Sequence, residues 1–203
     1  MRHPDNHGGL SLQSYRIVDL YSELVNIRKL LPDIVLDIRY ATVNNFTGKV
    51  IYPTAQAYLV KPAAEALVLV QQELNEEQLG LKIFDAYRPL SAQKVLWEIN
   101  PDPDYVADPA QGSRHNRGAA VDVTLIDSDG NDIPMPTSYD TFSEKAHSGY
   151  SDLPLPVLKN RTLLQNVMIK NGFEPLATEW WHFDYQSWEK YPILDINFDQ
   201  LED

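Results

Sequence analysis

Four residues whose side chains can bind a metal or move a proton lie in two short segments of this 203-residue chain. His115 and Asp122 lie in one segment, and Glu179 and His182 lie in another, much later in the chain. Two imidazoles and one carboxylate leave a fourth coordination position open, which is typical of catalytic rather than structural zinc sites. Glu179 is then free to act as the base on a metal-bound water. The residue types therefore predict a zinc hydrolase with one Zn²⁺ per chain.

The segment Ala119–Ile126 has the apolar alternation of a β-strand. In such a strand Asp122 points to the face opposite the apolar side chains. His115 lies seven residues earlier, and Gly118 permits a tight turn that would fold the histidine back toward Asp122. Taken alone, the pair has a second explanation, in which a buried aspartate accepts hydrogen bonds from loop amides and the histidine lies on an exposed turn.

The second segment, Glu179-Trp-Trp-His182, is predicted to begin a strand that extends to Tyr185. Strict alternation would point Glu179 and His182 to opposite faces, so a shared site requires a bend or bulge at the start of this strand. The alternative is an aromatic edge strand in which the tryptophans belong to the core and the histidine joins a hydrogen-bond network.

Arg88 follows a predicted strand, Leu81–Tyr87, and precedes Pro89. An arginine keeps its charge at every working pH, so it suits stabilising an oxyanion or binding a carboxylate. The alternative for this arginine is a surface salt bridge with Asp85 or Asp102.

The remaining periodicity predicts an α+β fold, in which helices pack against a central, mostly antiparallel sheet. The first strand is expected at Ile34–Tyr40, and long irregular segments at 41–56 and 132–156. Gly80 is expected to end the first helix and Ser91 to cap the second. The expected helices are Lys61–Leu79, Ser91 to about Ile99, and Leu158–Asn171. Residues 1–14 are expected to form a loose arm and 15–203 a single domain.

Composition excludes several other classes of protein. The net charge of −12 argues against nucleic acid or an anionic membrane as partner. The chain has no cysteine, which excludes disulfides, thiolate ligands and a cysteine nucleophile. No apolar stretch is long enough to span a bilayer, and no secretory signal is evident, so we expect a cytoplasmic protein. The oligomeric state stays open because no heptad pattern appears.

The segment around Arg88, the segment that contains His115 and Asp122, and the segment that contains Glu179 and His182 follow one another in this order. Together they resemble the zinc D-alanyl-D-alanine dipeptidases, the group that includes the vancomycin-resistance type. Zinc D,D-carboxypeptidases and the hedgehog domain are wider relatives. The pattern Ser-x-His-x-x-Gly-x-Ala-x-Asp fits residues 113–122 without a gap, and similar motifs lie at 40–48, 85–89 and 179–183. The likeness covers nearly the whole chain, from about Ile34 to Tyr185.

The resemblance implies hydrolysis of D-Ala-D-Ala, or a closely related D,D-dipeptide, to free amino acids. It implies zinc ligands at His115, Asp122 and His182, with Glu179 as the catalytic base. It also implies an oxyanion-stabilising Arg88. A small closed site must neutralise both ends of a dipeptide, so Asp140 or Asp85 is expected to meet the ammonium group, and Ser113 and Tyr40 the carboxylate. Arg114 occupies a position where the vancomycin-resistance type has a small polar residue. This difference bears on substrate preference and not on the chemistry.

Two other functions remain open at this point. One is a D,D-carboxypeptidase that trims peptidoglycan stem peptides, and the other is a metal-bearing binding module without activity, like the hedgehog domain. Two histidines and a carboxylate also suit divalent metals other than zinc. His147 in the long 132–156 segment could support the site or simply be exposed to solvent.

Overall fold

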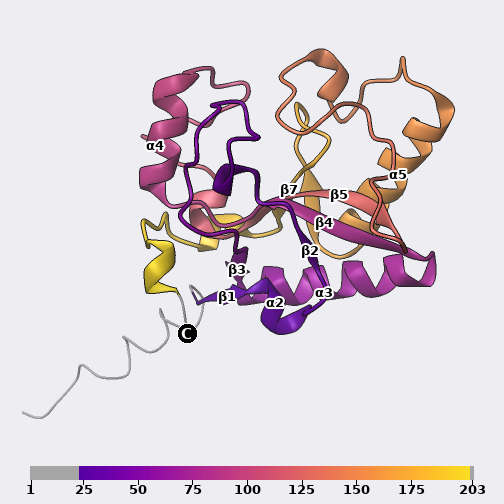
Figure 1. Ribbon diagram of the computed structural model, residues 1–203, viewed down its shortest axis with the longest axis horizontal. Helices are drawn as coiled ribbons and strands as arrows, with labels where there is room; N and C mark the ends of the chain where they lie inside the picture. Colours follow the sequence, from indigo (N-terminus) through magenta and orange to yellow (C-terminus); the bar gives the residue numbers. More distant parts are fainter. Residues whose placement is uncertain (1–22, 202–203) are drawn as a thin grey trace, which may run out of the picture.

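The structure is a computed structural model that describes residues 23–201. The predicted arm at 1–14 and the predicted start of the domain at residue 15 lie outside the described residues. A five-stranded sheet in the order β2-β4-β5-β7-β6 forms the centre of this part of the chain (Figure 1). Only β2 and β4 are parallel, and the other pairs are antiparallel. The strands are β2 (Val35–Leu36), β4 (Leu79–Asp85), β5 (Ala120–Asp127), β6 (Phe173–Pro175) and β7 (His182–Tyr185).

Two long helices, α3 (Lys61–Glu76) and α5 (Leu155–Lys170), contact each other and cover one face of the sheet. Helix α3 packs on β4, and α5 packs on β5 and β6. Leu67, Val70 and Leu74 recur at helical spacing and are fully buried. The shorter helix α4 (Leu90–Ile99) and the long loops lie on the other side of the sheet from α3 (Figure 1). The predicted α+β class with a mostly antiparallel sheet is therefore confirmed.

A small second sheet supports the turn that carries His115. Strand β1 (Leu24–Asn26), followed by the short helix α2 (Ile27–Leu30), pairs antiparallel with β3 (Tyr58–Val60). The Val60 amide donates to the Gly118 carbonyl at 2.9 Å. Gly118 has φ 63°, a conformation that favours glycine, and a Cβ there would lie 2.4 Å from Leu24 Cδ2, which would have to move. This confirms the turn predicted at Gly118, although the sequence patterns did not predict the small sheet. The remaining short elements are 3₁₀ helices: η1 (Arg39–Ala41), η2 (His115–Arg117), η3 (Glu144–Ala146), η4 (Trp188–Lys190) and η5 (Phe198–Gln200).

The strand predicted at Ile34–Tyr40 is wrong over most of its length. It pairs with β4 only at Val35–Leu36, and the chain then turns into η1. The Tyr40 carbonyl accepts hydrogen bonds from the amides of Ile51 and Tyr52, both at 2.8 Å. The turn buries the Tyr40 ring in the interior, where only 3% of the residue is exposed. Burial of this aromatic ring outweighs the local strand preference.

The predicted roles of Gly80 and Ser91 are also wrong. Helix α3 ends at Glu76, and Gln78 adopts the left-handed conformation with φ 59°. Gly80 instead lies within β4, where a Cβ would meet Gln71 Nε2 at 3.3 Å. Helix α4 has Pro89 at its N-cap, and the Ser91 amide is bonded by the Asp195 carboxylate at 2.8 Å. A residue distant in sequence therefore satisfies the free amide at this helix start.

Helix α5 begins at Leu155, three residues before the predicted start, with a proline in its first turn. The irregular segment before it is confirmed up to residue 154, with η3 inside it. No helix among residues 23–201 is long and apolar enough to cross a membrane.

Candidate metal centre and active site

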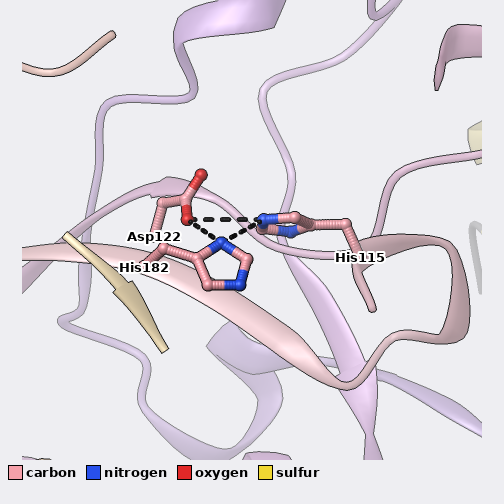
Figure 2. Close-up of side chains that lie close together, drawn as sticks. All are labelled: His115, Asp122 and His182. Atoms are coloured by element: carbon pink, nitrogen blue, oxygen red, sulfur yellow. Dashed lines mark hydrogen bonds and ion pairs between the residues drawn. The ribbon is translucent and has the colours of Figure 1, made fainter. Parts of the chain in front are cut away.

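The sheet and the η2 turn bring three of the predicted residues together. Asp122 on β5 and His182 on β7 are directly paired across the strands, and His115 reaches them from η2. His115 Nε2 lies 3.1 Å from His182 Nδ1 and 3.3 Å from Asp122 Oδ1. The distance from Asp122 Oδ1 to His182 Nδ1 is 3.1 Å. Figure 2 shows the three side chains pointing at one another, and all three are buried.

Hydrogen bonds behind the two histidines assign their tautomers. His115 Nδ1 lies 2.6 Å from the Ala86 carbonyl, and His182 Nε2 lies 2.9 Å from Asp184 Oδ1. Both partners are acceptors, so these nitrogens carry the protons. The lone pairs of His115 Nε2 and His182 Nδ1 therefore face the centre, as metal ligands must.

Asp122 completes the donor set. Its Oδ2 accepts a hydrogen bond from the Tyr139 hydroxyl at 2.9 Å, whereas its buried Oδ1 has no hydrogen-bond partner within residues 23–201. Burial alone would raise the pKa of this carboxyl, but the His115 and His182 rings hold it well below its usual range. Tetrahedral coordination at 2.0–2.2 Å would separate ligand atoms by about 3.3–3.6 Å, slightly more than the 3.1–3.3 Å found. The three residues therefore fit a zinc ion.

Asp184 is a residue of this centre that the sequence patterns did not single out. It orients His182, because its Oδ1 accepts the hydrogen bond from His182 Nε2 at 2.9 Å. Arg114 Nε lies 3.5 Å from Asp184 Oδ2, and its guanidinium stacks 4.5 Å from the centre of the Trp188 ring. The sequence did contain a signal for Asp184, because residues two apart on a strand, such as His182 and Asp184, share a face.

We predict that Asp184→Ala lowers the affinity of the centre for zinc by about 10- to 100-fold, because the ring loses its orienting acceptor. Competition with a chromogenic chelator would measure this affinity. Asp127→Ala is the matched control, since Asp127 accepts hydrogen bonds only within its own turn, from Asp129 and Asn131. Equal zinc affinity in the two variants would show that Asp184 does not support the ligand.

A turn before β7 resolves the predicted conflict between Glu179 and His182. The strand begins only at His182, and the His182 amide donates to the Glu179 carbonyl at 3.3 Å. The chain thereby brings Glu179 Oε2 within 3.8 Å of His182 Nδ1. Burial raises the pKa of the Glu179 carboxyl to about 8. This side chain therefore borders the centre as a base of raised proton affinity. The two intervening tryptophans are buried.

Arg88 is buried and held by two side chains. Its Nε and Nη2 donate to Asp85 Oδ2 at 3.1 and 2.7 Å, and its Nη1 donates to Gln93 Oε1 at 2.8 Å. The guanidinium lies over the Tyr40 ring, 5.1 Å from its centre. The pair with Asp85 is thus an interior contact and not the surface salt bridge considered as the alternative. It fixes the orientation of a permanent positive charge at the cavity.

Asp85 is separated from the other residues predicted to bind substrate. Its Oδ1 accepts from the Tyr52 hydroxyl and the Ala86 amide, both at 2.9 Å, and its Oδ2 accepts from Arg88. It is fully buried and is not among the residues that line the cavity. The structure therefore places Asp85 behind Arg88, whereas Asp140 lines the cavity.

The ligand set opens into a cavity of about 280 Å³. This volume lies just below the range of about 300–1,000 Å³ found for small-molecule sites. His147 follows η3 and is not among the lining residues. The other predicted site residues all line the cavity: Tyr40, Arg88, Ser113, His115, Asp122, Asp140, Glu179 and His182.

Asp140 provides a hydrogen-bond acceptor to the cavity, and Ser113 provides a donor. Asp140 Oδ1 accepts from the Tyr40 hydroxyl at 3.2 Å, and its buried Oδ2 has no hydrogen-bond partner in the described chain. Burial raises the pKa of this carboxyl to about 7. Ser113 Oγ accepts from the His115 amide at 3.2 Å, which leaves its hydroxyl proton free to donate. The cavity thus has an acceptor suited to a cation and a donor suited to an anion.

Comparison of the sequence with known proteins shows the family of this chain. Residues 21–198 match the family described as D-ala-D-ala dipeptidase. A D-alanyl-D-alanine dipeptidase of Escherichia coli K12 is 40% identical over 177 residues, which are 87% of this chain and 92% of the relative. One from Enterococcus faecium is 29% identical over 80% of this chain and 90% of the relative. Among solved structures, the LdcB LD-carboxypeptidase matches with a TM-score of 0.48 and 21% identity, over 83% of this chain and 71% of that chain.

Proposed function

From the premise that this chain belongs to the D-Ala-D-Ala dipeptidase family of peptidases, we propose that it hydrolyses free D-Ala-D-Ala, or a closely related D,D-dipeptide, to two amino acids. The observation that carries this proposal is the meeting, in one small cavity, of three residues that can bind a metal, Glu179, and Asp140 with its unpaired Oδ2. The donor types are those of catalytic zinc sites, which keep one position open.

Zinc is the proposed metal, one ion per chain, held by His115, Asp122 and His182. When bound, such an ion acts as a Lewis acid on the scissile carbonyl and lowers the pKa of a water molecule toward 7. The ligand geometry is set by the protein itself, because Ala86, Asp184 and Tyr139 hydrogen-bond to the outer atoms of the three ligands.

Glu179 is the proposed general base and acid. It takes a proton from the attacking water as the oxygen bonds to the peptide carbon, and then passes this proton to the leaving nitrogen as the C–N bond breaks. A carboxyl with a raised pKa suits this role, since it must both accept and release a proton near neutral pH. The net reaction adds one water across the peptide bond.

The remaining cavity residues are proposed to hold charge. Arg88 stabilises the negative charge that develops on the carbonyl oxygen, from a position fixed by Asp85. Asp140 binds the substrate ammonium through its free Oδ2. Ser113 meets the carboxylate, whereas the Tyr40 hydroxyl donates to Asp140 Oδ1 and orients that carboxyl group. These contacts use both charged ends of a free dipeptide, which favours a dipeptidase over the D,D-carboxypeptidase alternative.

The direct test is release of free D-alanine from D-Ala-D-Ala by the purified protein, beside N-acetyl-D-Ala-D-Ala and a metal-stripped sample. We expect metal-dependent cleavage of the free dipeptide alone, restored when zinc is added back. Cleavage of the acetylated peptide at a comparable rate would indicate a carboxypeptidase. Zinc binding without cleavage of any D,D-dipeptide would instead support a binding module.

The buried Asp140 predicts a pH dependence of substrate binding. Its raised pKa means that the carboxylate is protonated below about pH 7 and charged above it, and only the charged form pairs with an ammonium group. A bound divalent cation moves this step to lower pH. We therefore expect KM for D-Ala-D-Ala to rise as pH falls, starting at or below pH 7. Asp140→Asn should raise KM at the higher pH values, where the wild-type carboxylate is charged, and abolish this dependence, and an unchanged profile would contradict the assignment.

A further inference from the structure

Three aromatic side chains from distant segments meet at one side of the cavity. Phe142 is the central ring of this group: the Tyr105 ring stacks on it at 4.8 Å with an interplanar angle of 21°, and the Phe46 ring lies 5.2 Å away. All three residues line the cavity and are half-buried. They belong to the loop after η1, the loop after α4, and the loop between β5 and η3, all outside the regular strands (Figure 1). We call Phe46, Tyr105 and Phe142 the aromatic clasp.

The aromatic clasp is tied to Asp140. Phe142 follows Asp140 by two residues, and the backbone of Phe46 lies close enough to the Asp140 carboxyl to lower its pKa, against the larger effect of burial. Asp140 itself has φ 58°, a conformation that is uncommon for a non-glycine residue. The surrounding contacts therefore hold Asp140 in place beside the aromatic rings. The wall of the cavity next to the proposed ammonium site is thus made by Phe46 and Phe142.

We propose that the aromatic clasp sets the length limit of the substrate by closing the cavity beyond its amino end. This inference rests on the proposed dipeptidase function, because it assumes that Asp140 receives the substrate ammonium. An acyl group on the amino nitrogen extends away from the scissile bond and past Asp140, into the volume that Phe46 and Phe142 occupy. A free amino group ends before that volume.

Two separate physical effects then discriminate against an acylated dipeptide. An amide nitrogen carries no charge, so it leaves the buried Asp140 carboxylate without a cationic partner. The acyl carbons also collide with rings that are held by one another and cannot retreat independently. The first effect depends only on whether the nitrogen is acylated, whereas the second grows with the length of the acyl chain. Chain length therefore separates the contribution of the clasp from that of Asp140.

The test compares kcat/KM for D-Ala-D-Ala with kcat/KM for its N-acetyl, N-butanoyl and N-hexanoyl derivatives. Phe142→Ala removes the central ring, and we expect the ratio of acylated to free substrate to rise by about tenfold or more, most strongly for the longer chains. Tyr105→Ala removes a half-buried partner of Phe142 and should raise the ratio in the same direction, so the test does not depend on one variant folding. Tyr150→Ala is the matched control, because Tyr150 is also half-buried in a loop but does not line the cavity.

The outcomes distinguish the two levels of the argument. If the wild-type protein cleaves D-Ala-D-Ala but both clasp variants keep the wild-type ratio at every chain length, the clasp inference is overturned and the proposed function stands. A uniform fall of all activities in the clasp variants, with no change in the ratio, also overturns it, because a purely structural role acts equally on all substrates. If the wild-type protein cleaves no D,D-dipeptide, the proposed function fails and the inference fails with it.

Discussion

Glu179→Gln is expected to lower kcat for D-Ala-D-Ala by about 10²- to 10⁴-fold while zinc stays bound. Glutamine has nearly the same shape as glutamate but cannot accept the proton of the attacking water. The proposed ligands His115, Asp122 and His182 keep their own supporting hydrogen bonds, none of which involves the Glu179 side chain. The loss should therefore appear in turnover and not in metal content, which elemental analysis of the purified variant would verify.

Glu174→Gln is the control for this substitution, because Glu174 is an exposed carboxylate on β6, the strand that pairs with β7. It should keep wild-type kcat and KM. Near wild-type turnover in Glu179→Gln or in Glu179→Ala, with one zinc per chain, would remove Glu179 from the mechanism. An equal loss of zinc and activity would instead show that this carboxylate acts on the metal site.

Arg88→Lys is expected to lower kcat by about 10²- to 10³-fold, the usual cost of losing an oxyanion-stabilising donor. Lysine keeps the positive charge beside Asp85, so a buried carboxylate is not left unpaired. It cannot reproduce the planar guanidinium that bonds Asp85 and Gln93 at the same time. The charge therefore remains in the cavity but loses its fixed direction, and steady-state kinetics would show the fall in kcat with a much smaller change in KM.

Arg161→Lys provides the matched control, since Arg161 is also buried but donates to backbone carbonyls of the loop before α5, away from the cavity. Thermal unfolding of both variants would compare their stability. If Arg88→Lys and Arg161→Lys lose similar stability and Arg88→Lys keeps its kcat, Arg88 has only a structural role.

The sequence predicted the parts of this site that depend on local patterns. The strand predicted at Ala119–Ile126 is found at Ala120–Asp127, and alternation placed Asp122 on the functional face correctly. The turn at Gly118 was also predictable, because a short turn between His115 and the strand needs a residue that tolerates positive φ. Such features are set by the backbone preferences of adjacent residues.

Other predictions failed where distant segments compete with local preference. Ser91 has the residue type of a helix cap, but Asp195 reaches the free amide from the end of the chain. The segment Ile34–Tyr40 has the composition of a strand, but burial of the Tyr40 ring turns it away from the sheet after two residues. These outcomes depend on packing partners that no local window of sequence contains.

By itself, the sequence determined the inventory of chemical groups: two histidines, the carboxylates and one arginine, in an order that predicts metal-assisted hydrolysis. The tertiary structure decided how they are used. It paired Asp122 with His182 across β5 and β7, bent the chain so that Glu179 faces the same centre, and placed Asp85 behind Arg88. The physical reason is that side-chain types and backbone preferences are local, whereas distances, burial and the resulting pKa values arise only when segments far apart in the chain exclude water together.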